Sequence, residues 1–192
     1  DDLEFWQEHG YVIIPEAAPQ ENLQSVIDAI WEFQEMNPTD PESWYRTPDR
    51  VNGMVELNGS GMVEMYNHPA LWANRQLPRI HGAFADLWGT AHLWVTIDRC
   101  NLNVPNRAEF DFGGFIHWDI DTSVIPLPFD MQGVLSLTDT TPEQGGFQCV
   151  PGMPASLPEW IATQPADRNP HRPDMAGLVM AGLEVKTVAT RA

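Results

Sequence analysis

Lysine is nearly absent from this sequence. Lys186 is the single lysine beside nine arginines in 192 residues, and 27 acidic residues bring the formal net charge to −17. A surface of this sign repels phosphate backbones and anionic bilayers, so neither nucleic acid nor a membrane is expected as a partner. An ordinary acidic surface and adaptation to salt would both produce these numbers, and the sequence does not decide between them.

Cysteine and long apolar runs are also scarce. Cys100 and Cys149 lie far apart among apolar neighbours and without a C-x-x-C spacing, which excludes a redox motif or a zinc knuckle and favours two small core residues. The sequence has no basic leader and no stretch of about 18 uninterrupted apolar residues. We expect a cytoplasmic protein whose natural start is not Asp1.

The composition predicts one folded domain over residues 1–192. Hydrophobic residues make up 43% of the chain, and 17 prolines and 14 glycines divide them into short segments. Short apolar segments between turn residues are typical of strands, so the expected fold class is mainly β with flanking helices. Strands are expected at 11–15, 92–102, 114–119, 131–138, 146–150 and 182–189.

Helical periodicity and turn residues predict the remaining elements. Gly10 is a candidate C-cap for a helix at 3–9, and apolar residues repeat every three to four positions over 20–36. A further helical pattern at 69–88 must break or restart at Pro78. A short helix is expected at 157–163. Loops are expected at 37–53 and 103–113.

The motif with the clearest chemistry is His117-Trp118-Asp119. In a strand, residues two apart point to one face, so the imidazole and the carboxylate would project together while Trp118 faces the other way. One carboxylate with two imidazoles forms the facial triad of non-haem iron(II) sites, which leaves coordination positions open. Roughly 0.4 such pairs arise by chance in a chain like this one. The alternative is a buried histidine bonded to a carboxylate for structural reasons.

The context of this motif resembles a known family. The segments Arg99–Asn103, Gly114–Asp119, Gln132–Asp139 and Gly145–Gly152 are similar, in order and spacing, to the phytanoyl-CoA dioxygenase family of iron(II)- and 2-oxoglutarate-dependent oxygenases. The opening Phe5–Val12 resembles the family's first helix and strand, so the likeness covers nearly the whole chain. The resemblance implies a double-stranded β-helix, a cupin-like jelly roll.

The resemblance also implies an activity and a set of residues. His117 and Asp119 would be iron ligands, and Asn101 and Gln132 would contact 2-oxoglutarate. The enzyme would use dioxygen to hydroxylate a small molecule. Asp119 argues against the halogenating relatives, which replace this carboxylate by a small residue.

Two residues required by the family's mechanism are missing. The distal histidine and the arginine that pairs with 2-oxoglutarate follow a segment like Gly182–Val188, but the sequence ends at Ala192. We expect an incomplete domain without its closing strands. By itself it would be inactive, and it would either self-associate through exposed strand edges or belong to a longer polypeptide. His171, in a Pro-rich loop, is not expected to be the third ligand.

Two rival functions remain open at this point. The first is a binding or structural jelly roll that keeps the fold but cannot turn over, because it lacks the distal ligand. The second is a cupin-like enzyme that uses another divalent metal without 2-oxoglutarate.

Overall fold

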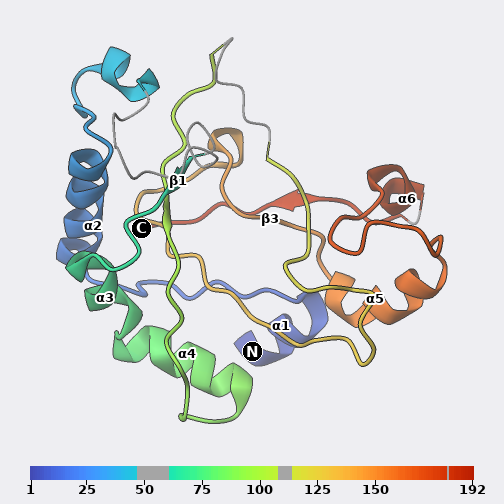
Figure 1. Ribbon diagram of the computed structural model, residues 1–192. Coiled ribbons are helices and arrows are strands. Elements are labelled where there is room, and N and C mark those ends of the chain that lie inside the picture. Colours follow the sequence, from blue (N-terminus) through green and yellow to red (C-terminus); the bar gives the residue numbers. More distant parts are fainter. Residues whose placement is uncertain (47–60, 108–113, 181) are drawn as a thin grey trace. The chain divides into compact units, whose positions relative to one another are not determined.

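The computed structural model describes residues 1–46, 61–107, 114–180 and 182–192 (Figure 1). The chain forms two compact units. Unit 1 joins Asp1–Pro15 to Gly114–Arg191, and unit 2 comprises Glu16–Gly113 together with Ala192. The position of one unit relative to the other is not determined, so the expectation of a single domain stays a prediction.

Unit 1 begins with helix α1 (Asp2–His9), which ends at Gly10 as the sequence predicts. Gly10 has a left-handed backbone with φ of 75°, and its N–H donates to the Trp6 carbonyl over 2.7 Å. Helix α1 contacts α5 (Met153–Ala162). A Cβ atom at Gly10 would lie 2.4 Å from Pro154 Cγ, so both the backbone and the packing require glycine here.

The core of unit 1 forms around α5. Its buried members are Val150, Met153, Leu157, Trp160 and Leu178. Leu178 comes from α6 (Met175–Met180), a short helix that the sequence analysis does not anticipate. Trp118 and Ile120 are half-buried and pack against this cluster, which anchors the His117–Asp119 segment to the core.

A small sheet and an isolated bridge complete unit 1. Strand β3 (Gln148–Cys149) pairs antiparallel with β4 (Lys186–Thr187). Thr140 and Thr190 exchange backbone hydrogen bonds of 2.9 and 3.1 Å beyond the end of that pair. A 3₁₀ turn, η3 (Pro142–Gln144), connects the two regions.

The described part of unit 2 is built on three α-helices, namely α2 (Gln20–Phe33), α3 (Pro69–Arg75) and α4 (Pro78–Trp88). Helix α2 packs against α3 in Figure 1. It buries one stripe made of Leu23, Val26, Ala29 and Ile30. Pro78 starts α4, as predicted, because a proline lacks an N–H that the first helical turn does not need. No helix in the described ranges is long and apolar enough to cross a bilayer.

The remainder of unit 2 is stabilised by a pair of two-residue strands and by hydrogen bonds from arginine side chains. Strand β1 (Met62–Val63) pairs antiparallel with β2 (Cys100–Asn101). Arg75 donates to the carbonyls of Tyr66, at 2.8 Å, and of Asp98. These contacts join the end of α3 to the segment that leads into β2.

An arginine also organises the 3₁₀ helix η1 (Pro41–Tyr45) of unit 2. Arg107 donates to both carboxylate oxygens of Glu42, at 2.8 and 3.3 Å, and stacks 3.6 Å from the centroid of the Tyr45 ring. The hydrogen bond and charge of Arg107 hold the pKa of Glu42 below its ordinary value. Tyr45 in turn donates to the Pro105 carbonyl over 2.8 Å.

The predicted jelly roll, a mainly β fold, is wrong. The described residues are mostly helix and loop, and their strands are confined to the two-stranded sheets β1–β2 and β3–β4. The segments 11–15, 114–119 and 131–138 have strand-like sequences but no sheet partner. Side-chain preference favours an extended backbone, whereas a strand also needs a neighbouring chain to pair with. The parts of the expected loops at 47–53 and 108–113 lie outside the described residues.

The two cysteines give a prediction about reactivity. Burial raises the pKa of the Cys100 thiol to about 11 and also raises the pKa of Cys149, which is the less buried of the two. Because the thiolate is the reactive form, both should alkylate slowly at neutral pH in the folded protein, with Cys149 labelled first. Mass spectrometry after timed iodoacetamide exposure measures the order. Faster labelling of Cys100 would contradict its burial.

Candidate functional site

The side chains of His117 and Asp119 lie on one side of their segment and close together. His117 Nε2 is 3.1 Å from Asp119 Oδ1, and the two side chains are 42% and 55% exposed. Exposure alternates along this segment, since residues 115, 117 and 119 are exposed while residues 116, 118 and 120 are half-buried. The segment therefore keeps the alternating geometry of a strand although it is not part of a sheet.

Gln132 completes this group. Its side-chain amide donates a hydrogen bond to Asp119 Oδ2, the carboxylate oxygen that does not face His117. Two ligands at right angles, each about 2.1 Å from an octahedral ion, are about 3 Å apart. The spacing between His117 and Asp119 therefore fits two neighbouring ligands of one metal ion, with Gln132 orienting the carboxylate.

The opposite side of the segment fixes its position. The ring centroids of Trp118 and Trp160 are 5.3 Å apart, and both residues belong to the packing around α5. Because Trp118 packs into the core, the residues on either side of it must face away. The core of unit 1 thereby sets the orientation of both candidate ligands.

A second segment, residues 168–172, runs alongside the candidate ligands and is held there by Thr122. Arg168 donates to Thr122 Oγ1 at 2.6 Å and to its carbonyl at 2.8 Å. Thr122 is fully buried, and its hydroxyl donates to the Pro170 carbonyl over 2.5 Å. The Trp118 N–H donates to the His171 carbonyl over 2.9 Å. These bonds fix the loop without using the His171 imidazole.

The sequence analysis missed Phe115 and Arg172 as members of this site. The Phe115 ring lies 4.6 Å from the His117 ring, centroid to centroid, and the guanidinium carbon of Arg172 lies 4.9 Å from the centroid of Phe115. The Phe115 ring is therefore a neighbour of both the imidazole and the guanidinium. Alternation along the strand-like segment places Phe115 on the face of His117, but nothing in the sequence indicates that the 168–172 loop returns to it.

Asp121 is a nearby carboxylate with a separate set of contacts. The Ser123 hydroxyl and backbone N–H donate to it over 2.6 and 2.9 Å, and they hold its pKa below the ordinary value. The positive charge of Arg168 acts in the same direction. Asp121 is thus oriented by Ser123 rather than by His117.

Asn101, the other predicted contact of 2-oxoglutarate, lies on β2 in unit 2, opposite Met62. Since the units are not placed relative to each other, its role stays a prediction. Within the described ranges, no three His, Cys, Asp or Glu side chains gather closely enough to hold a metal.

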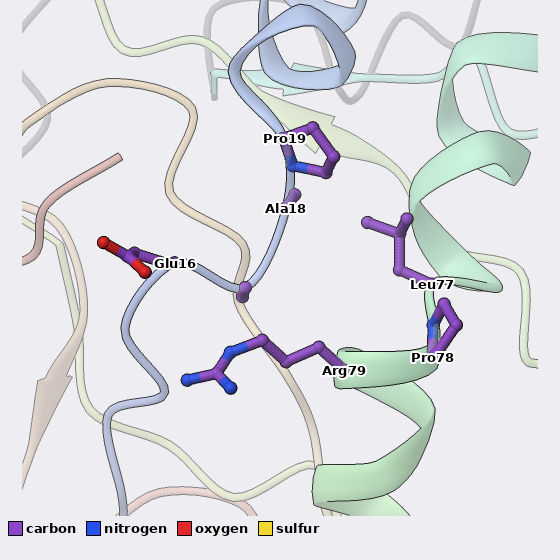
Figure 2. A pocket seen from close by; sticks show the side chains of 7 residues that line it. Glu16, Ala18, Pro19, Leu77, Pro78 and Arg79 are labelled. Carbon is purple, nitrogen blue, oxygen red and sulfur yellow. The ribbon is translucent and has the colours of Figure 1, made fainter.

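Unit 2 contains a hollow of its own, shown in Figure 2. It measures about 440 Å³ and lies between the segment before α2 and the start of α4. Its walls are Glu16, Ala17, Ala18, Pro19, Leu77, Pro78 and Arg79. Arg79 extends its guanidinium towards the Glu16 segment in Figure 2, and the lining residues other than Glu16 and Arg79 are apolar. This hollow is open and contains none of the predicted site residues.

Comparison with known proteins gives one distant likeness. Ava biosynthesis cluster protein O from Aspergillus versicolor is 26% identical over 167 residues, which cover 84% of this chain. The match covers 52% of that protein, so the chain spans about half of the relative's length. No family model matches the chain, and no solved structure matches it.

Proposed function

We propose that the chain carries part of the active site of an iron(II)- and 2-oxoglutarate-dependent dioxygenase of the phytanoyl-CoA dioxygenase type, which hydroxylates a small molecule. The supporting observation is the paired placement of His117 and Asp119, 3.1 Å apart on an exposed face. An imidazole and a carboxylate at neighbouring positions are two of the three ligands in a facial triad.

The chain's own residues would divide the work as follows. His117 and Asp119 would hold the iron, and Gln132 would keep the carboxylate turned towards it through the Asp119 Oδ2 hydrogen bond. Trp118 would prevent rotation of the segment by packing into the core. Bound iron and 2-oxoglutarate would supply the activation of dioxygen. The predicted contact of Asn101 with 2-oxoglutarate belongs to this proposal.

The distant relative is named as a biosynthesis cluster protein, and a biosynthetic role is compatible with the proposed activity. The half-exposed pair also leaves room for an additional ligand and for a substrate. The rival is a binding protein that does not turn over, since a group of three metal-binding side chains is absent from the described residues. A cytoplasmic location stays a prediction.

Anaerobic calorimetry with iron(II) and 2-oxoglutarate, followed by a succinate assay after dioxygen is admitted, tests the proposal. The 192-residue chain should bind iron(II) weakly, because two protein ligands hold this ion poorly, and it should release no succinate. A C-terminally extended form of the chain that supplies the missing histidine and arginine should bind both and, once dioxygen is admitted, release succinate. Tight binding and succinate release by the 192-residue chain alone would contradict an incomplete site.

The control for this experiment is Asp119→Asn in the extended chain. Asparagine keeps the size of the side chain but removes the charge that neutralises the metal. Iron binding should fall with the substitution while the fold is retained, because Asp119 is exposed. If neither form of the extended chain binds iron(II), the dioxygenase proposal fails.

A further inference from the structure

Arg172 has an unusual place in this site. It is exposed, and its guanidinium lies 4.9 Å from the centroid of the Phe115 ring, the ring that contacts His117. A cation over an aromatic face is stabilised by the ring quadrupole, and this arrangement leaves the N–H edge of the guanidinium available. Arg172 is thus one aromatic ring away from the candidate metal ligands.

Several other arginines of the described residues have their donors engaged within the chain. Arg107 pairs with Glu42, and Arg168 is bonded to Thr122. No described carboxylate lies within ion-pair distance of Arg172, although the chain has 27 acidic and only 10 basic residues. A cation without a carboxylate partner in so acidic a chain is suited to an anion from outside.

The backbone around Arg172 is also fixed. The preceding residue, His171, accepts the Trp118 N–H through its carbonyl and donates its own N–H to the Asn169 side chain over 2.9 Å. Arg168 ties the start of the loop to buried Thr122. The guanidinium is therefore presented from a loop attached to the same segment that carries His117 and Asp119. Such attachment lowers the cost of ordering the side chain when an anion binds.

We propose that Arg172 recognises an anionic group, a carboxylate or a phosphate, on the molecule that reacts at the His117–Asp119 pair. This rests on the proposed function, and it assigns the substrate to the class of small organic acids or phosphate esters. The planar guanidinium binds either group with two parallel hydrogen bonds. Phe115 neighbours both Arg172 and His117, so it would contact the carbon skeleton that joins the anionic group to the reacting carbon.

The test uses the ¹⁵N-labelled chain and three probes that share one aromatic ring, namely benzoate, phenyl phosphate and neutral benzamide. Either anion should shift the Arg172 Nε–H resonance, which is identified by its loss in Arg172→Gln. That substitution should weaken anion binding about tenfold or more, as expected for a lost charge-assisted hydrogen bond. Arg172→Lys should recover part of the affinity because it restores the charge.

Arg46→Gln is the matched control. Arg46 is an exposed arginine paired with Asp40 at 3.8 Å, so this variant makes the same change of charge elsewhere. It should bind benzoate like the unmodified chain. Phenyl phosphate binding more tightly than benzoate would identify phosphate as the recognised group, and the reverse order would identify carboxylate. Equal binding of benzamide, or unchanged affinity in Arg172→Gln, would overturn the proposal.

Mn²⁺ binding is measured on the same samples by electron paramagnetic resonance. It tests the metal site at His117 and Asp119 separately from the anion site at Arg172. If Mn²⁺ binds through His117 but the anions do not depend on Arg172, only the substrate assignment fails. If the anions bind through Arg172 but no metal binds at His117, the dioxygenase proposal fails and the anion site remains. If both bind, Mn²⁺ should broaden the Arg172 Nε–H resonance, because the His117 ring and the Arg172 guanidinium lie 4.6 and 4.9 Å from the centroid of the same phenyl ring. An unbroadened resonance would contradict a shared site.

Discussion

Replacing His117 by alanine should abolish succinate release in a form of the protein that turns over 2-oxoglutarate. The expected loss exceeds a hundredfold, because removing even a second partner of a metal ligand costs about 10–100-fold in affinity or activity. The fold should remain, since the His117 side chain is 42% exposed and contacts Phe115 and Asp119 rather than the core. Succinate release and circular dichroism measure the two quantities.

His171→Ala is the matched control, because His171 is an exposed histidine in the adjacent loop. Its carbonyl, not its imidazole, bonds to Trp118, so alanine keeps that contact. We expect its succinate release to stay close to that of the unmodified protein. Loss of activity in His171→Ala together with full activity in His117→Ala would reassign the metal ligand and contradict the account.

Leu178→Ala should give the largest loss of stability among simple substitutions in unit 1. Leu178 is 1% exposed and belongs to the cluster around α5, so truncation leaves a cavity against Trp160 and its neighbours. The expected loss in the free energy of unfolding is about 2–5 kcal/mol. Hydrogen exchange of peptides from residues 114–180 in increasing urea measures this loss within unit 1.

The neighbouring residue provides a control within the same helix. Val179 is 70% exposed, so Val179→Ala should change the free energy of unfolding by no more than about 0.5 kcal/mol. The two substitutions share α6 and differ mainly in burial. If both lower stability equally, helix propensity rather than core packing holds α6 in place, and the described core of unit 1 is incorrect.

Local features were predictable from the sequence because they depend on neighbouring residues. Gly10 ends α1, Pro78 begins α4, and the apolar stripe of α2 faces the core, each through interactions within a few positions. Helix α5 begins at Met153, ahead of the predicted 157–163, because Pro154 is tolerated near the start of a helix and Gly152 precedes it. The helical pattern was therefore visible only in part.

Pairing between distant segments could not be predicted in the same way. The strands β3 and β4 fall inside the expected segments 146–150 and 182–189, yet the pairs formed are two residues long. Extended-chain preference at 131–138 did not produce a sheet, because preference for an extended backbone does not supply a partner strand. The fold class was predicted wrongly for this reason. The family resemblance implied the same mainly β jelly roll, which the described residues do not form.

In the candidate site, too, the features set by neighbouring residues were predictable and those set by distant contacts were not. Alternation within residues 115–120 predicts that His117 and Asp119 share a face, and their 3.1 Å separation agrees with it. Arg172 could not be found, because its position depends on the bonds between Arg168 and Thr122, which are 46 residues apart in sequence. Contacts between residues so far apart in sequence depend on how the whole unit packs.

The most direct test of the central claim is pulsed electron paramagnetic resonance of the 192-residue chain with enough Mn²⁺ to fill its weak two-ligand site. Nitrogen from a coordinated imidazole couples to the electron spin of the metal, so the spectrum reports histidine ligation directly. The account predicts a ¹⁴N coupling in the unmodified chain that disappears in His117→Ala and weakens in Asp119→Asn. A ¹⁴N coupling that persists in His117→Ala, or Mn²⁺ that gives only the signal of the hydrated ion in the unmodified chain, would contradict a metal site at His117 and Asp119.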